Sequence, residues 1–361
     1  MLKKIDLYIL KRYLVTFSTM LLLFVPIGII IDVSEKINKM VENQAPLDKI
    51  ALYYIDFTIY FANLLFPIFL FLSIIWFTSK LANNTEIIAI LSSGISFQRF
   101  LRPYIFGASI VSVVSLLMGF YLVPKASDGF KTFRYTYLIG NGINEMREYK
   151  DIYRQISPNE YIYVSTFNGD TKFAFKFCME RFDGNKLTTK VTADRIRWNQ
   201  KDSTYTLFDC VKRKIRKGND ILEKSTQKDT VIPLDINDLS PVIFKAETLT
   251  VGDLRDFIEK ERQRGSANIS VYEVVLYKKF SIPVSAFILT IIAVAVSSMK
   301  RRGGMGMNLA LGILIAFSYV FFDKIFGVLA EKSSIPPFTA VWIPNVIFGI
   351  LAYYLLKHAK R

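Results

Sequence analysis

Several charged residues of this chain lie in or beside long apolar segments, where binding of ions or anionic groups is the chemistry they could do. Asp323 and Lys324 interrupt one such segment, and Lys36 and Lys39 follow the end of another. Charges inside a bilayer are costly and usually face a protein interior or a watery cavity, whereas a lysine at headgroup depth attracts anions as a point charge. Two plainer interpretations stay open: Asp323 and Lys324 neutralise each other, and the two lysines belong to a solvated loop of mixed charge.

Covalent chemistry is nearly excluded by the residue types present. The 361 residues include one histidine, His358 in the C-terminal tail, and two cysteines, Cys178 and Cys210. A Ser-His-Asp triad, a histidine-rich metal site and a zinc cluster therefore do not fit this sequence, and it contains no GxxxxGK[ST] phosphate loop. We expect a protein that is not an enzyme and needs no cofactor. Cys178 and Cys210 form either a disulfide or two separate thiols.

The elements that position these charges are long apolar helices. Hydrophobic residues make up 52% of the chain, and six runs approach the roughly 20 residues needed to cross the hydrocarbon core of a bilayer. The runs are Tyr13–Ile31, Leu52–Phe77, Tyr104–Val123, Phe280–Met299, Leu309–Leu329 and Phe338–Leu356. We predict an α-helical membrane bundle of six transmembrane helices. In such a protein the net charge of +15 reflects orientation and lipid contact, so we expect no nucleic-acid partner.

Basic residues in the short loops indicate how the bundle is oriented. They gather at the N-terminus, between the second and third runs (Lys80, Arg99 and Arg102), at 300–302 and in the C-terminal tail. The positive-inside rule places these parts in the cytoplasm, so both termini should be cytoplasmic. Lys278 and Lys279, at the opposite end of the fourth run, do not follow this trend.

The segment 124–277 lies on the far side of the membrane in this topology and has the pattern of an all-β domain. Phe173, Phe175 and Phe177 alternate with polar or small residues, which is typical of a strand with one apolar face. The segment therefore predicts a sandwich or a curved sheet, with these phenylalanines in its core. A helix should follow at Val251–Arg264, ended by Gly265. The chain would thus consist of 1–123, the inserted domain 124–277, and 278–361.

The connector between the second and third runs is too patterned for a simple turn, and it predicts a short helix within 83–95. Asn84 or Thr85 can cap this helix, and Glu86 in its first turn suits the positive end of the helix dipole. Ile87, Ile88, Ile90 and Leu91 would form its apolar face, Gly94 would end it, and Ser96 would cap the next helix, which contains Arg99. Such a helix either rests in the membrane interface or docks into a groove of a cytoplasmic partner.

Three stretches carry a family resemblance: "TEIIAILSSGISFQR", "KKFSIPVSAFILTIIAVAVSS" and "FSYVFFDKIFGVLAEKSSIPP". On these stretches the chain resembles the YjgP/YjgQ family, the F- and G-type (LptF/LptG) permease subunits of the lipopolysaccharide export transporter. The last stretch, which contains Asp323, Phe326 and Gly327, is more similar to the G-type subunit. The resemblance covers essentially the full length.

The resemblance implies an inner-membrane machine. A paralogous permease subunit and two copies of a separate ATPase would be partners, and the inserted periplasmic domain would be β-jellyroll-like. The transported molecule would be lipopolysaccharide, which enters from the outer leaflet of the inner membrane. It is then passed to a periplasmic lipopolysaccharide-bridge protein, while ATP hydrolysis in the partner drives the cycle.

The resemblance also implies roles for particular residues. The connector matches the family's coupling helix, so the ATPase-coupling residues would be Glu86, Ile87, Ile90, Leu91, Gly94 and Arg99. The lateral gate and lipid-binding residues would be Lys36, Lys39, Asp323, Lys324 and Phe326. The chain departs from the G-type pattern at Ile31, which falls where the family has its innermost lysine.

Two other functions fit parts of the sequence. A carrier driven by a proton gradient could use Asp56 or Asp323 as its proton site, although no inverted repeat relates the first three runs to the last three. A scaffold could bind periplasmic proteins through its β domain, although a single span would suffice to anchor it.

Overall fold

The computed structural model describes residues 3–139, 150–168, 171–199, 202, 204–216, 218–232, 244–266, 268–298, 304–332 and 334–359. The chain divides into two compact units, Met1–Lys131 with Ser270–Arg361, and Thr132–Ile269.

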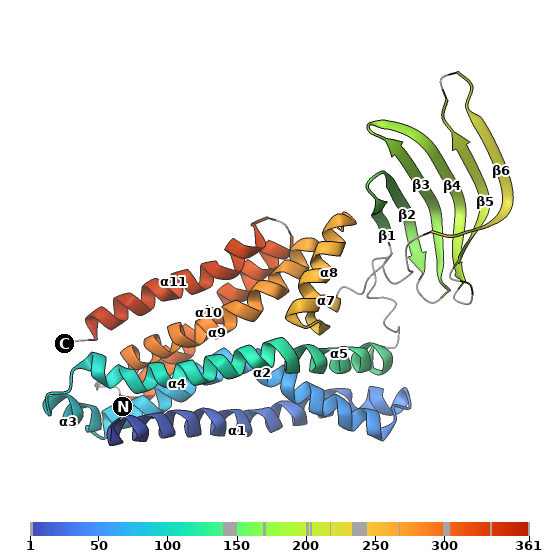
Figure 1. Ribbon diagram of the computed structural model, residues 1–361. Helices are drawn as coiled ribbons and strands as arrows, with labels where there is room; N and C mark the ends of the chain where they lie inside the picture. The colour runs from blue at the N-terminus through green and yellow to red at the C-terminus, as the bar shows by residue number, and fades with distance from the viewer. Residues whose placement is uncertain are drawn as a thin grey trace. The chain divides into compact units, whose positions relative to one another are not determined.

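The first unit is a bundle of long helices, all of which are drawn in Figure 1. They are α1 (Lys4–Glu42), α2 (Leu47–Asn83), the short α3 (Glu86–Ser92), α4 (Phe97–Leu117), α9 (Ile269–Ser297), α10 (Gly304–Glu331) and α11 (Pro337–His358). The helix of α4 continues through a π-helical turn, η1 (Met118–Leu122), into α5 (Val123–Phe133) and a second π-helical turn, η2 (Arg134–Leu138). The third apolar helix is therefore longer than its sequence pattern predicts.

Six of the described helices are long and apolar enough to span a membrane, which confirms the predicted six-span bundle. Each predicted run lies within one of them, except that the fourth run extends past the end of its helix at Ser297 to Ser298 and to Met299, which is outside the described residues. Burial differs strongly between them. The most apolar window of α9 is 67% buried, against 11% for α1 and 22% for α10. Thus α9 forms the centre of the bundle, and α1 and α10 expose most of their apolar surface.

Small residues allow the helices to approach closely. A side chain at Gly107 of α4 would overlap the ring of Tyr13 on α1, and one at Gly312 of α10 would overlap Ile75 on α2. Ser112 of α4 is buried and donates a hydrogen bond to the carbonyl of Pro283 on α9, at 3.0 Å. Small residues at helix crossings are typical of membrane bundles, because lipid gives no hydrophobic drive for association.

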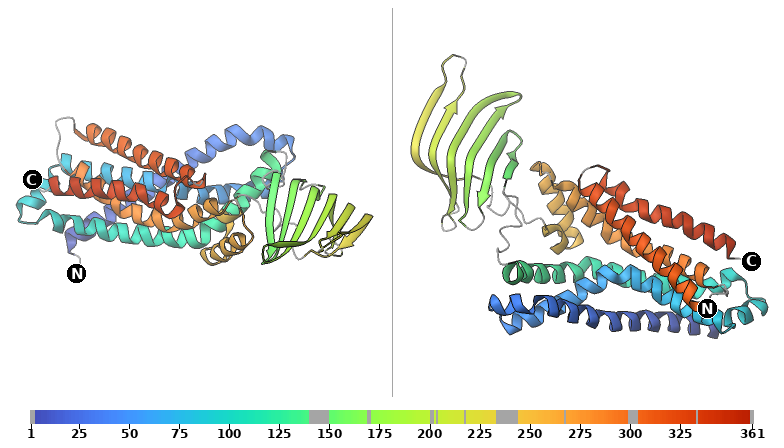
Figure 2. Two further views of the ribbon diagram at one scale, coloured as in Figure 1. Left: turned by 90° about the horizontal axis from the view of Figure 1, so that it is seen from above. Right: turned by 180° about the vertical axis from the view of Figure 1, so that it is seen from behind.

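The second unit contains one antiparallel sheet whose strands follow each other in sequence order. They are β1 (Lys150–Ser157), β2 (Glu160–Asn168), β3 (Phe173–Asp183), β4 (Lys186–Asn199), β5 (Thr204–Lys214) and β6 (Ile221–Thr230). This confirms the inserted β domain. Of the two forms left open by the sequence, the described strands form a curved sheet, as both views in Figure 2 show. Its core lies on one face, around Ile162, Val164, Phe177, Ile196 and Leu207.

A crease runs across this sheet from strand to strand. Asp151, Lys176 and Asp209, on β1, β3 and β5, have positive φ angles of 50°, 52° and 51°. The strand register places them at one level, together with Ser165 of β2 and Asp194 of β4. Consecutive core residues on either side of this level are three positions apart instead of two: Val164 and Phe167, Ala174 and Phe177, Ala193 and Ile196, Leu207 and Cys210. On these four strands, β2 to β5, the side-chain alternation therefore shifts by one residue at this level, while the register between neighbouring strands is the same on both sides of it.

The crease makes one sequence prediction wrong. Phe173, Phe175 and Phe177 were expected to share the core face, but Phe175 is 41% exposed while Ala174 and Phe177 are 1% and 2% exposed. The left-handed conformation of Lys176 reverses the alternation between Phe175 and Phe177. Phe173 therefore lies on the other face, where the guanidinium groups of Arg195 and Arg197 lie over its ring.

Two short helices complete the second unit, α7 (Lys245–Thr248) and α8 (Val251–Gln263). The side chain of Thr250 accepts a hydrogen bond from the backbone N–H of Asp253, and Gly265 follows the helix with φ +70°. These are the helix and the glycine stop that the sequence predicts. The carbonyl of Arg264 accepts a hydrogen bond from the backbone of Gln155 on β1, which joins α8 to the sheet.

Candidate functional site

The connector between α2 and α4 folds as a short helix held against the bundle by its apolar side. Ile87 is 1% exposed, and Ile90 and Leu91 pack against the bundle core, whereas Ile88 is 55% exposed. The expected apolar face is therefore split: three of its side chains fix the helix in place, and Ile88 faces outward. Gly94 has φ +85°, the left-handed conformation expected at the end of a helix.

The start of this helix differs from the expected cap. Thr85 is in the left-handed region (φ 62°), and neither it nor Asn84 caps the helix through its side chain. The carboxylate of the half-buried Glu86 instead accepts hydrogen bonds from the side-chain amide of Asn84 at 3.2 Å and from the hydroxyl of Tyr8 on α1 at 3.3 Å. Glu86 is therefore oriented by α1 while one side stays accessible.

Arg99 is tied to the beginning of α1. Its guanidinium pairs with the carboxylate of Asp6 at 2.5 Å, and that carboxylate also accepts the backbone N–H of Lys3 at 2.7 Å. The predicted cap of α4 is present, since the Ser96 side chain accepts from the backbone N–H of Arg99 at 3.3 Å. Asp6 and Tyr8 were not among the predicted site residues, because they lie 93 and 78 positions from their partners and carry no local signal in the sequence.

The two lysines at the end of α1 have different surroundings. The ammonium of Lys36 pairs with the buried carboxylate of Asp32, one turn earlier, and lies 3.3 Å from the hydroxyl of Tyr53. Tyr53 in turn donates to Asp32 at 3.0 Å. Lys39 is exposed and has no ion pair with any described residue. The charge of Lys36 is thus largely neutralised, and Lys39 is the accessible cation.

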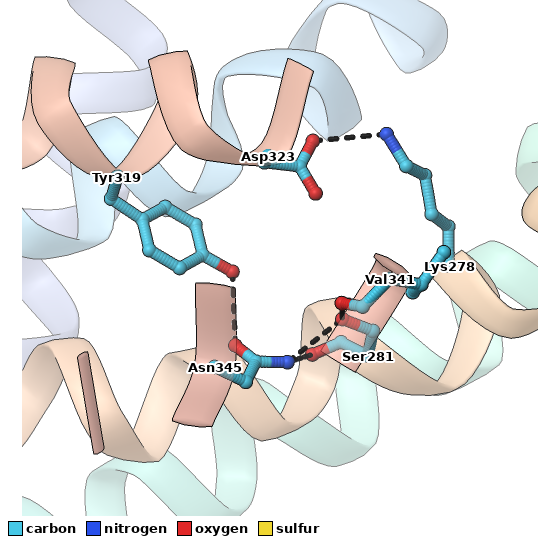
Figure 3. Close-up of polar contacts among 6 residues, drawn as sticks. All are labelled: Lys278, Ser281, Tyr319, Asp323, Val341 and Asn345. Carbon is cyan, nitrogen blue, oxygen red and sulfur yellow. Dashed lines mark hydrogen bonds and ion pairs between the residues drawn. The ribbon is translucent and has the colours of Figure 1, made fainter. Parts of the chain in front are cut away.

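Asp323 on α10 pairs with a lysine of α9 and not with its neighbour Lys324. The ammonium of Lys278 lies 3.0 Å from its carboxylate, and both side chains are 25% exposed (Figure 3). Gly327, one turn along α10, leaves room for this lysine, because a side chain there would meet its ammonium at 3.2 Å. Lys324 is exposed. Of the two interpretations left open by the sequence, mutual neutralisation of Asp323 and Lys324 is therefore wrong, because neighbours on a helix point in different directions.

A buried polar cluster lies beside this pair and joins three helices (Figure 3). The amide of Asn345 on α11 donates to the hydroxyl of Ser281 on α9 at 2.8 Å and accepts from the hydroxyl of Tyr319 on α10 at 3.1 Å. All three side chains are at most 5% exposed. The cluster fixes the relative position of α9, α10 and α11, because each buried polar group depends on its partner. In the sequence, this cluster was indicated only by Asn345, a polar residue within the apolar run Phe338–Leu356.

Lys279, adjacent to Lys278, is buried and binds to the third long helix. Its ammonium donates to the carbonyl of Gly119 at 2.9 Å, within the π-helical turn η1. A π-helical turn leaves carbonyls without their usual partners, so a buried ammonium group can donate a hydrogen bond to one of them. Lys278 and Lys279, the two lysines that do not follow the distribution of basic residues in the loops, are therefore both bound within the bundle. Phe326 also points inward, packing beside Val274 and Val341.

The apolar face of the sheet contains a cavity of about 310 Å³. Phe177, Met179, Val191 and Leu207 form its apolar lining, and Lys212, Lys214, Lys224 and Lys228 lie along one side. Cys178 and Cys210 are both free thiols, and burial raises the pKa of each. In the described part of the chain no group of three histidine, cysteine or carboxylate side chains is placed to hold a metal ion.

These features define a class: a membrane protein of six apolar helices, with a β domain inserted between the third and fourth and a short helix in the second connector. Residues 7–358 match the sequence profile of the lipopolysaccharide export system permease LptF/LptG family, and the chain belongs to that family. It is also similar to the lipopolysaccharide export system permease protein LptG of Haemophilus influenzae, with 20% identity over 82% of each chain. The family resemblance read from the three sequence stretches is confirmed, and the preference for the G-type subunit stays a prediction.

Proposed function

We propose that this chain is one permease subunit of an ATP-driven exporter that extracts lipopolysaccharide from the outer leaflet of the inner membrane. A paralogous permease, two copies of an ATPase subunit and a periplasmic bridge protein are its partners. Family membership over 7–358 carries this proposal. The basic loops support an orientation with both termini and α3 in the cytoplasm and the β domain in the periplasm.

In this proposal α3 transmits force from the ATPase. A lever has to be fixed on one side and accessible on the other, and α3 combines a buried Ile87 with an exposed Ile88. Glu86 offers a carboxylate for the partner while Tyr8 orients it. Ile90, Leu91 and Gly94 set the helix position, and Arg99 holds α4 to α1 through Asp6.

The lipid path runs along the exposed helices. Seven apolar side chains of α10 are at least 39% exposed (Met307, Ile313, Leu314, Phe317, Phe321, Ile325 and Val328), and α1 also exposes most of its apolar side chains. Lys39 and Lys324 are the accessible cations for lipid phosphates, while Lys36 and Asp323 are already paired. The apolar cavity of the sheet, with lysines along one side, suits acyl chains attached to an anionic group.

The test is co-expression of Glu86→Arg with the ATPase subunit. A like charge at the contact opposes docking by several kcal/mol, so we expect loss of the complex on co-purification and at least a tenfold fall in lipopolysaccharide release from proteoliposomes. Glu42→Arg, an exposed position at the other end of α1, is the control and should behave like the native chain. Unchanged assembly and export in Glu86→Arg contradicts the coupling role. Export driven by a proton gradient without nucleotide contradicts the whole proposal.

A further inference from the structure

A cavity of about 430 Å³ opens at the α3 end of the bundle, between the first turn of α1, the end of α3 and the start of α4. Its polar lining includes Lys3, Arg99 and Arg102, and its apolar lining includes Ile90 and Phe100. Figure 1 shows the N-terminus beside α3 and the beginning of α4 at this end.

The charge of this cavity is unbalanced. Asp6 is its only acidic lining residue among those described, and Arg99 already neutralises it. Arg102 is exposed and pairs with no described carboxylate, and Lys3 adds a second uncompensated cation. The first turn of α4 also directs its positive dipole end here. The cavity therefore has an excess of about two positive charges and no internal anion to balance them.

We propose that this cavity binds the phosphate of an anionic phospholipid in the membrane leaflet on the α3 side. The shared requirement is a phosphate group, which Arg102 and Arg99 can bind through directed guanidinium N–H groups. A lipid fits better than a free phosphate ion, because isoleucine and phenylalanine side chains lie next to the cations. The basic loops place this end in the cytoplasm, where the leaflet is rich in anionic lipid.

Occupancy would affect α3 directly. Ile90 and Gly94 of the α3 region and Arg99 of α4 lie on the same wall, so a bound phosphate links the end of α3 to the start of α4 and to α1. The lipid thereby sets the angle of the connector. The inference rests on the proposed orientation of the bundle and does not rest on the transported substrate.

The experiment is native mass spectrometry and thermal unfolding of the detergent-solubilised full chain titrated with phosphatidylglycerol or phosphatidylethanolamine. We expect phosphatidylglycerol to bind and stabilise the native protein, and Arg102→Gln to weaken that binding about tenfold, as loss of one charge-assisted hydrogen bond predicts. Lys80→Gln removes one charge from the same end of the bundle, outside the cavity, and should bind normally. Lys3→Gln provides a second cavity variant if Arg102→Gln does not fold.

Three results would overturn the inference. If Lys80→Gln weakens phosphatidylglycerol binding as much as the cavity variants do, the binding depends on general surface charge and not on the cavity. Displacement of the lipid by millimolar inorganic phosphate, with the same stabilisation from phosphate alone, assigns the cavity to a soluble anion. Loss of phosphatidylglycerol binding when the ATPase subunit is added assigns the cavity to a protein contact.

Discussion

Arg99 at the start of α4 forms an ion pair with Asp6 in the first turn of α1, at 2.5 Å, although 93 positions separate them in the chain. Together with the hydrogen bond from Tyr8 to Glu86, it joins α1 both to the connector helix α3 and to the start of α4. The geometry at α3 thus depends on α1 as much as on the connector's own sequence.

Replacing Asp6 with Asn should loosen this junction. The Asp6 side chain is 6% exposed, and Arg99 would lose the one carboxylate that it pairs with among the described residues, so we expect a loss of roughly 2 kcal/mol in unfolding free energy. Thermal unfolding in detergent measures this. Lys11→Gln, an exposed charge on the same helix, should change the midpoint little. An Asp6→Asn midpoint equal to that of the native chain would show that the pair contributes nothing.

The Lys278–Asp323 pair can be measured by a double-mutant cycle. Lys278→Gln and Asp323→Asn should each destabilise the bundle, and the double variant should cost less than their sum, with a coupling of about 1 kcal/mol. Lys324→Gln serves as the control, because Lys324 is exposed and does not contact Asp323 in this structure. Additive effects of the two substitutions, or coupling of Asp323 to Lys324, would contradict the observed pairing.

Asn345 should be needed for the contact between α10 and α11. Asn345→Leu removes the side-chain oxygen to which the buried hydroxyl of Tyr319 donates at 3.1 Å, and loss of this buried hydrogen bond costs about 1–3 kcal/mol. Adding Tyr319→Phe removes the hydroxyl that uses this acceptor, so the double variant should recover part of the loss. Both are read from unfolding midpoints in detergent. If Tyr319→Phe adds its own full loss instead, the hydroxyl does not depend on Asn345.

Glu261 predicts a pH dependence of the second unit. It is fully buried, near Arg154 and 3.3 Å from Arg264, and burial raises its pKa above the ordinary glutamate value despite these cations. A carboxyl group with a raised pKa in the folded state takes up a proton more readily folded than unfolded. Its stabilising contribution is therefore complete below the unfolded pKa and is lost as the pH rises through the folded pKa.

The native chain should accordingly gain stability relative to Glu261→Gln as the pH falls from 7 to about 4. Unfolding of the full-length protein, followed by a probe in the second unit, measures the difference at each pH. Glu259→Gln on the same helix, at an exposed position, should show no such trend. A native-minus-variant difference that stays constant with pH would contradict the raised pKa.

The sequence predicted the elements far better than it predicted the partners of its charged residues. Long apolar runs determine the six spans, and Thr250 and Gly265 mark α8 by local chemistry. The partner of Asp323 could not be predicted in this way, because Lys278 lies on another helix and reaches it only through the bundle. Lys36 pairs with Asp32, and this pair could be predicted because the two residues are one helical turn apart in the sequence. The contact of Lys36 with Tyr53 could not be predicted, because it depends on how α1 packs against α2.

The β domain shows a different limit. Alternation along β3 is a sound indicator of its core face only while every residue is extended, and Lys176 is not. The lysine at position 176 does not indicate a left-handed conformation, because glycine and asparagine are the residues that usually adopt it. The same displacement recurs at Asp209 on β5, so it is a property of the sheet and not of one strand.

That line of left-handed residues divides the sheet into two panels. Strand pairing is intact on both sides of it, while the pairs at its own level are missing from the ladders. The bend between the panels therefore lies at this level on every strand from β1 to β5, at Asp151, Lys176 and Asp209 and at Ser165 and Asp194 between them. A change of curvature at this level would alter the width of the apolar face while leaving the hydrogen-bonded ladders of both panels intact.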